Sequence, residues 1–420
     1  MSAKLHRLAN GLRVVCDPLP DFQTFALSVV AGRGARSEAP AQSGWAHLLE
    51  HMVFKGAGGR SARELAEAVE AEGGQINAAT GYERTSFQIR ALKGGLPLAV
   101  EILSDLVLRP TLDPEELERE KSVIAQEIAD AADAPDDKVF ELAQAQAFTG
   151  QALGRPILGR TRTVNTADPR ALSAFRASQY APEQLVVSAA GSVDEDELLG
   201  LVEQAFQGPP GPVSAKPAPA QFKGGAAALA RRLEQAHTVL LLPGVGARDE
   251  AYFVQRLFAE ALGGGMSSRL FQEAREKLGL AYTIDAYAEG YEDVGVLGVY
   301  AGTSGADAGK TVQVCADQLI ALAEGADDVE LARSKAQLKA HLFMARESPL
   351  LRAEQAAGQT LLFDRLFTPD QMAQAIDAVG VEDIRAYGRR VLEAGCAATA
   401  VLGPKSALNA ADAFRQTLFG

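Results

Sequence analysis

The chain has 420 residues, of which 47% are hydrophobic and 23% charged, and its formal net charge at pH 7 is −13. This length and composition are typical of a globular protein with two or three domains. The acidic balance argues against nucleic acid as a partner, and no apolar run approaches the roughly 20 residues that span a bilayer.

The N-terminal residues and the cysteines indicate the compartment. The stretch from Met1 to Val15 has neither the apolar core of a signal peptide nor an Arg- and Ser-rich transit segment. Cys16, Cys315 and Cys396 are far apart and are not spaced as metal ligands, which is typical of a reducing compartment. We therefore expect a cytoplasmic protein with no membrane partner.

Hydrophobic periodicity in the first part of the chain predicts alternating strands and helices. A capping box, Ser61-Ala62-Arg63-Glu64, begins one helix, and Gly73-Gly74 follows its end. Asp113-Pro114 is the expected start of a long charged helix. The predicted strands cover residues 8–15, 25–30, 75–80 and 85–91, and the predicted helices lie within 43–56, 61–72, 96–108 and 113–131.

The segment 43–56, SGWAHLLEHMVFKG, contains the order H-x-x-E-H. In a helix, His47 and His51 lie one turn apart on one face with Glu50 beside them, and Ser43 is the expected N-cap. Two imidazoles at this spacing can bind one metal ion, and the carboxylate can act on a water molecule. The alternative is two ordinary histidines on a helix, and a third ligand would argue against it.

A candidate third ligand lies in the charged helix. Glu120 and Glu127 are seven residues apart and share one face. The usual interpretation of glutamates on a helix is solvated surface charge. However, Val123, Ile124 and Ile128 indicate that this stretch is partly buried, which makes Glu127 a candidate ligand.

Residues 208–225, GPPGPVSAKPAPAQFKGG, contain five prolines and predict a linker between domains 1–207 and 226–420. The two sides repeat at an offset of 212, because GRGARSE at 32–38 matches GVGARDE at 244–250. We therefore expect two homologous α+β domains, each an antiparallel sheet with helices packed on one face.

The predicted repeat places a metal site in the first domain alone. At the offset of 212, His47, Glu50 and His51 correspond to Ala259, Leu262 and Gly263, which are not metal ligands. The second domain is therefore expected to have the same framework and a different task.

Several motifs together resemble those of the pitrilysin family of zinc metallopeptidases, which bind metal through an inverted H-x-x-E-H motif. Within this family, the chain resembles bacterial relatives of the mitochondrial processing peptidase β subunit. The similarity covers nearly the whole chain. It rests on HLLEH at 47–51, Glu127 at 76 residues after His51, Glu120 one heptad before Glu127, GQINA at 74–78, LGRPILG at 153–159, and Arg275 and Tyr282 in EAREKLGLAY.

The resemblance implies the processing-peptidase fold and one Zn²⁺ per chain. It assigns the metal to His47, His51 and Glu127, with Glu50 as general base and Glu120 orienting a ligand.

The same resemblance assigns residues to the substrate. Asn77 and Ala78 would hold peptide backbone by strand addition, and Arg275 and Tyr282 would bind a substrate carbonyl or the tetrahedral oxyanion. The residues alone favour a surface arginine at Arg275 and a core tyrosine at Tyr282. For Glu120 the alternative is a plain salt bridge, and for Asn77 and Ala78 it is an ordinary sheet strand, which is compatible with the substrate role.

The resemblance also implies an assembly and a source. Because the family's chamber needs four such domains and this chain has two, we expect a homodimer acting on extended peptides. The short glycine segment at 263–270 and the missing transit segment favour a bacterial cytoplasmic protein.

Two other functions are alternatives to an independent endopeptidase. A non-catalytic scaffold, as in the core subunits of respiratory complex III, would need the fold without Glu50 and the ligands. An enzyme that depends on a separate inactive partner would not need Arg275 and Tyr282 in this chain. The sequence therefore favours a zinc endopeptidase.

Overall fold

The computed structural model describes residues 3–207 and 215–420, and these divide into two compact units. The first unit comprises Met1–Ile128, Pro156–Ala218 and Phe343–Thr368; the second comprises Ala129–Arg155, Pro219–Leu342 and Pro369–Gly420. Each unit thus takes one segment from the other side of the predicted linker. Residues 208–214 of that linker lie outside the described residues, and a contiguous division at 207 and 226 stays a prediction.

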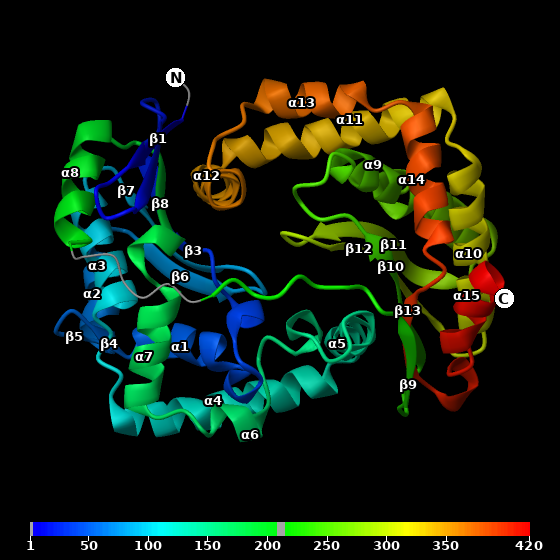
Figure 1. Ribbon diagram of the computed structural model, residues 1–420, viewed down its shortest axis with the longest axis horizontal. Helices are drawn as coiled ribbons and strands as arrows, with labels where there is room; N and C mark the ends of the chain where they lie inside the picture. The colour runs from blue at the N-terminus through cyan, green and yellow to red at the C-terminus, as the bar shows by residue number, and fades with distance from the viewer. Residues whose placement is uncertain (1–2, 208–214) are drawn as a thin grey trace. The chain divides into compact units, whose positions relative to one another are not determined.

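The first unit contains a six-stranded sheet (Figure 1). All neighbouring strands are antiparallel except β2 and β8, which are parallel. The strand predicted at 8–15 is confirmed for residues 13–15 and wrong at its start, because Leu8 N–H and C=O both bond within a turn in which Gly11 has φ 86°. The strand order is β1 (Lys4–Arg7), β2 (Arg13–Pro18), β8 (Leu185–Gly191), β3 (Thr24–Ala31), β7 (Thr85–Leu92) and β6 (Gln75–Thr80).

Helices cover both faces of this sheet. The main core lies on one face, where buried side chains of four helices meet those of the strands: α1 (Trp45–Val53), α3 (Leu96–Leu108), α7 (Pro169–Gln179) and α8 (Glu195–Ala205). On the other face α12 (Pro349–Phe363) packs on β2, β3 and β8. The other elements are α2 (Ala62–Ala71), α4 (Pro114–Asp133), α6 (Thr161–Val164) and the hairpin β4 (Gly56–Ala57) with β5 (Arg60–Ser61).

The second unit repeats this plan with a five-stranded sheet, whose β13–β9 pair is parallel and whose other pairs are antiparallel. Helix α5 (Pro135–Ala147) packs on β9, β10 and β13. The strand order is β11 (Ala281–Gly290), β12 (Gly295–Ser304), β10 (Gln235–Gly244), β13 (Ala398–Gly403) and β9 (Gly225–Ala230). The helices are α9 (Tyr252–Gly263), α10 (Ala308–Glu324), α11 (Asp328–Met344), α13 (Pro369–Ala378), α14 (Val381–Glu393) and α15 (Ala410–Phe419), with a π-helical turn, η5, at Phe271–Lys277.

The structure confirms a two-domain α+β fold and adds two features to the prediction. Each sheet contains one parallel pair, so neither sheet is purely antiparallel. Among the described elements, α12 also packs on the second face of one sheet and α5 on that of the other. These helices occupy equivalent positions of the repeat, so each half of the sequence supplies a helix to the other half's sheet. Among the described helices, none is long and apolar enough to cross a membrane.

Candidate active site

Helix α1 is capped by a carboxylate that precedes it by several residues. Glu38 is buried, and its two oxygens accept hydrogen bonds from the backbone N–H groups of Gly44 at 3.0 Å and Ala46 at 2.7 Å. The negative charge of Glu38 also interacts favourably with the positive end of the helix dipole, at the N-terminus of α1. The prediction of Ser43 as N-cap is wrong: the cap residue is Gly44, and the buried Ser43 hydroxyl has no partner among the described residues.

Two glycines allow the start of α1 to approach a distant loop. Gly44 has φ 94° and Gly159 has φ 72°, a region that favours glycine. A Cβ on Gly44 would lie 2.6 Å from the Leu158 carbonyl oxygen, and one on Gly159 would lie 2.3 Å from that of Ser43. This close approach explains the second glycine of LGRPILG in physical terms.

Replacing Glu38 with alanine should destabilise the first unit by about 2 kcal/mol, because two buried N–H groups lose their acceptor. Urea unfolding measures this change. Glu64→Ala is the matched control, since Glu64 caps the exposed start of α2 and should cost only about 0.5–1 kcal/mol. Equal losses in the two variants would refute the special role of the buried cap.

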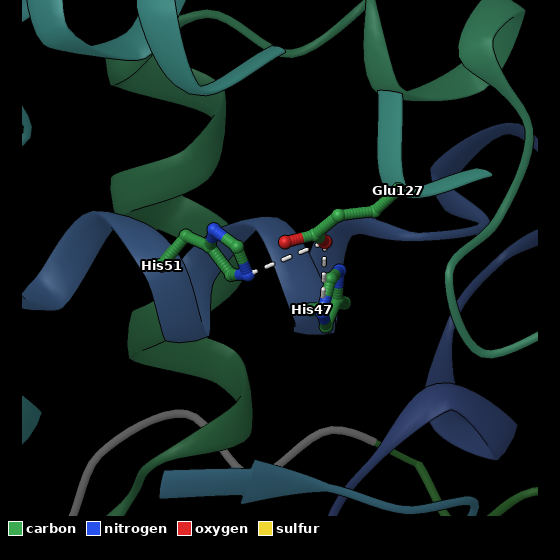
Figure 2. A group of neighbouring side chains, drawn as sticks. All are labelled: His47, His51 and Glu127. Atoms are coloured by element: carbon green, nitrogen blue, oxygen red, sulfur yellow. Dashed lines mark ion pairs between the residues drawn. The ribbon is translucent and has the colours of Figure 1, made fainter. Parts of the chain in front are cut away.

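Three side chains that the sequence singled out converge in the first unit. His47 and His51 point from α1 toward Glu127 of α4 (Figure 2). Glu127 Oε2 lies 3.8 Å from His47 Nε2 and 3.6 Å from His51 Nε2. Ligands about 2.1 Å from a tetrahedral zinc are about 3.4 Å apart. The three possible ligand atoms lie within 4.8 Å of one another, so these residues could hold the ion after they move closer together.

The protonation of His47 suits a metal ligand. Burial, with a further contribution from His51, lowers the pKa of His47 to about 4. The imidazole is therefore neutral at physiological pH, and a neutral imidazole has the lone pair that binds a metal.

A buried carboxylate orients the second histidine. Glu120 Oε2 lies 3.0 Å from His51 Nδ1, and Lys55 Nζ lies 2.6 Å from Glu120 Oε1. The bond at Nδ1 leaves His51 Nε2 directed at Glu127. The sequence indicated Glu120 but not Lys55, although Lys55 lies four residues after His51.

Glu50 is held beside these residues by Thr80, the last residue of β6. Thr80 Oγ1 donates a hydrogen bond to Glu50 Oε2. Burial raises the pKa of Glu50, while the bonds from Thr80 and the nearby His51 oppose that rise. A carboxylate with a raised pKa is better suited to accept a proton near neutrality. The sequence did not indicate Thr80.

The predicted substrate residues lie in two places. Asn77 and Ala78 are on β6, the last strand of the first unit's sheet. Arg275 and Tyr282 belong to the second unit, where the Arg275 guanidinium lies 4.8 Å from the Phe271 ring centroid and Tyr282 is 61% exposed. Their part in the site stays a prediction.

Comparisons with known proteins identify the family of the chain. Residues 13–161 match the model of the insulinase family, peptidase family M16, and residues 166–338 match that of the peptidase M16 inactive domain. An uncharacterized zinc protease of Streptomyces coelicolor is 36% identical, over 92% of this chain and 86% of its own. One of Rickettsia bellii is 34% identical, over 95% of this chain and 97% of its own.

Solved structures share the fold. A peptidase M16 inactive domain of Pseudomonas fluorescens has a TM-score of 0.89 at 19% identity, covering 96% of this chain and 98% of its own. A protease of Helicobacter pylori has a TM-score of 0.88 at 22% identity, covering 96% and 100%. Together with the matches in sequence, these show that the chain belongs to peptidase family M16, the insulinase or pitrilysin family of zinc metallopeptidases.

Proposed function

We propose that the protein is a zinc-dependent endopeptidase that hydrolyses extended, unstructured peptides. The observation that carries this proposal is the convergence of His47, His51 and Glu127 beside Glu50. The names of the relatives, which are zinc proteases, support the reaction class. A non-catalytic scaffold would need the same fold, but it would not need these four side chains.

The chemistry follows from the residues present. His47, His51 and Glu127 would hold one zinc ion per chain, which lowers the pKa of water and polarises a carbonyl when bound. Glu50 accepts a proton from the water that attacks the scissile carbonyl, and returns it to the leaving amine. Glu120 keeps the His51 ring in place through Nδ1.

The substrate would bind as an added strand. Asn77 and Ala78 lie on β6, the edge strand of the described sheet. The backbone groups of Ala78 point outward there, and pairing with them requires an extended peptide. Arg275 and Tyr282 would bind the substrate carbonyl or the oxyanion from the second unit of a partner subunit. The protein would therefore act as a homodimer with an enclosed chamber. Its location would be the bacterial cytoplasm.

Substrate selection can be tested with one small disulfide-bonded domain in two forms. The reduced and alkylated form is unstructured, whereas the oxidised form is folded at the same sequence. We expect the zinc-loaded protein to cleave the unstructured form faster by on the order of 10³-fold or more, because a folded domain is rarely open. Mass spectrometry of the fragments measures both rates. Equal cleavage of the folded form at native sites would exclude the proposed selection.

A further inference from the structure

The proposed base contacts the strand proposed to hold the peptide. Glu50 lies on α1, and Thr80 is the last residue of β6. The Thr80 hydroxyl donates a hydrogen bond to Glu50 Oε2 at 2.5 Å. The backbone N–H of Thr80 also helps to lower the pKa of this carboxylate, after the larger contributions of the hydroxyl and of His51. The hydroxyl therefore orients the Glu50 carboxylate.

The edge position of β6 explains why this N–H is available. Gly81 N–H donates to the Arg84 carbonyl and closes the turn between β6 and β7. Because opposed pairs alternate in an antiparallel ladder, the backbone groups of Ala79 point to β7, and those of Ala78 and Thr80 point outward. The backbone N–H of Thr80 acts on the Glu50 carboxylate. The backbone N–H of Ala78 faces the edge where a peptide would pair.

The side chain of Thr80 is directed by the same alternation. Ile76 and Ala78 pack against the core of the first unit, and Thr80 lies on their face of β6, toward α1. The hydroxyl thus reaches Glu50 only because β6 ends where it does. A shift of β6 along its own direction would move this hydroxyl and the peptide-binding edge together.

We infer that Thr80 is a positioning residue for Glu50, and that it couples the base to the strand on which the peptide binds. The inference rests on the proposed function and adds a residue to it. Thr80 holds Oε2, so that Oε1 of Glu50 is the oxygen left to take the proton from water. One short strand then sets both the position of the peptide and the direction of the base.

The test compares Thr80→Val, which removes the hydroxyl at nearly constant shape, with Thr80→Ser, which keeps it. With an unstructured peptide as substrate, Thr80→Val should lower kcat by about tenfold to a hundredfold with KM nearly unchanged, because the base is misdirected. Thr80→Ser should restore most of kcat. Thr24→Val, at an exposed position of β3, is the matched control and should behave as wild type.

A chelator competition gives a readout other than activity. Zinc affinity should be the same in wild type, Thr80→Val and Thr80→Ser, because the Thr80 hydroxyl bonds to Glu50 and not to any of the three proposed ligands. The inference is wrong if Thr80→Ser is as impaired as Thr80→Val, if KM rises while kcat is kept, or if Thr80→Val loses zinc.

A double-mutant cycle keeps this inference separate from the proposed function. Urea unfolding of Thr80→Val, Glu50→Ala and the double variant should show a combined loss of stability smaller than the sum of the single losses. Strict additivity would mean that no such contact exists. If the wild-type protein hydrolysed no peptide, the proposed function would fail, and this cycle would still decide whether Thr80 holds Glu50.

Discussion

Glu50→Gln is expected to abolish peptide hydrolysis and to leave the metal site intact. The substitution removes the group that accepts the proton of water, while His47, His51 and Glu127 are unchanged. A general base contributes 10²–10⁴-fold, so the loss in kcat should be on the order of 10³-fold. Zinc content, measured by elemental analysis after dialysis, should stay near one ion per chain.

His47→Ala completes this experiment because it should lose both zinc and activity. Removing one of three ligands weakens the site itself, whereas Glu50→Gln alters only the proton acceptor. Glu70→Gln, at an exposed position of α2, controls for the loss of a surface charge. Full activity of Glu50→Gln would show that another group is the base, and full zinc content of His47→Ala would remove His47 from the ligands.

Mixed dimers of two inactive variants are expected to regain activity. One variant is Glu50→Gln, and the other combines Arg275→Ala with Tyr282→Phe. The proposed base and the proposed oxyanion residues lie in different compact units. In a two-fold symmetric dimer with sites completed in trans, each mixed dimer contains one site in which every part is intact. Random mixing makes half of the dimers mixed, so about a quarter of the wild-type activity should return.

The controls for mixing are the two inactive variants alone, and proof of subunit exchange by pull-down of differently tagged chains. Light scattering first establishes whether the protein is a dimer. A verified mixture that stays inactive would show that each chain completes its own site. A stable monomer with full activity would refute the dimeric chamber as well.

Features that depend on neighbours along the chain could be predicted from the amino-acid sequence. The spacing of His47, Glu50 and His51 places them on one face of a helix, because a helical turn is short and regular. The capping box at Ser61 and the cap at Asp113 are local in the same way, and the structure shows both. The helix expected at 96–108 has those bounds in the structure.

Contacts between segments that are distant in sequence could not be predicted in this way. Lys55 reaches Glu120 and Thr80 reaches Glu50 only because α4 and β6 pack beside α1, which no local pattern specifies. The prediction of Ser43 as N-cap was wrong for the same reason. The longer side chain of Glu38, from an earlier turn, accepts hydrogen bonds from the backbone N–H groups of Gly44 and Ala46.

The pairing of strands and the placement of helices were also beyond local patterns. Strands β2 and β8 are separated by most of the first half of the chain, and their parallel direction depends on the path between them. Helix α12 covers a sheet formed by the other half of the sequence. Local periodicity fixes which face of an element is apolar, but the partner of that face is chosen by packing of the whole chain.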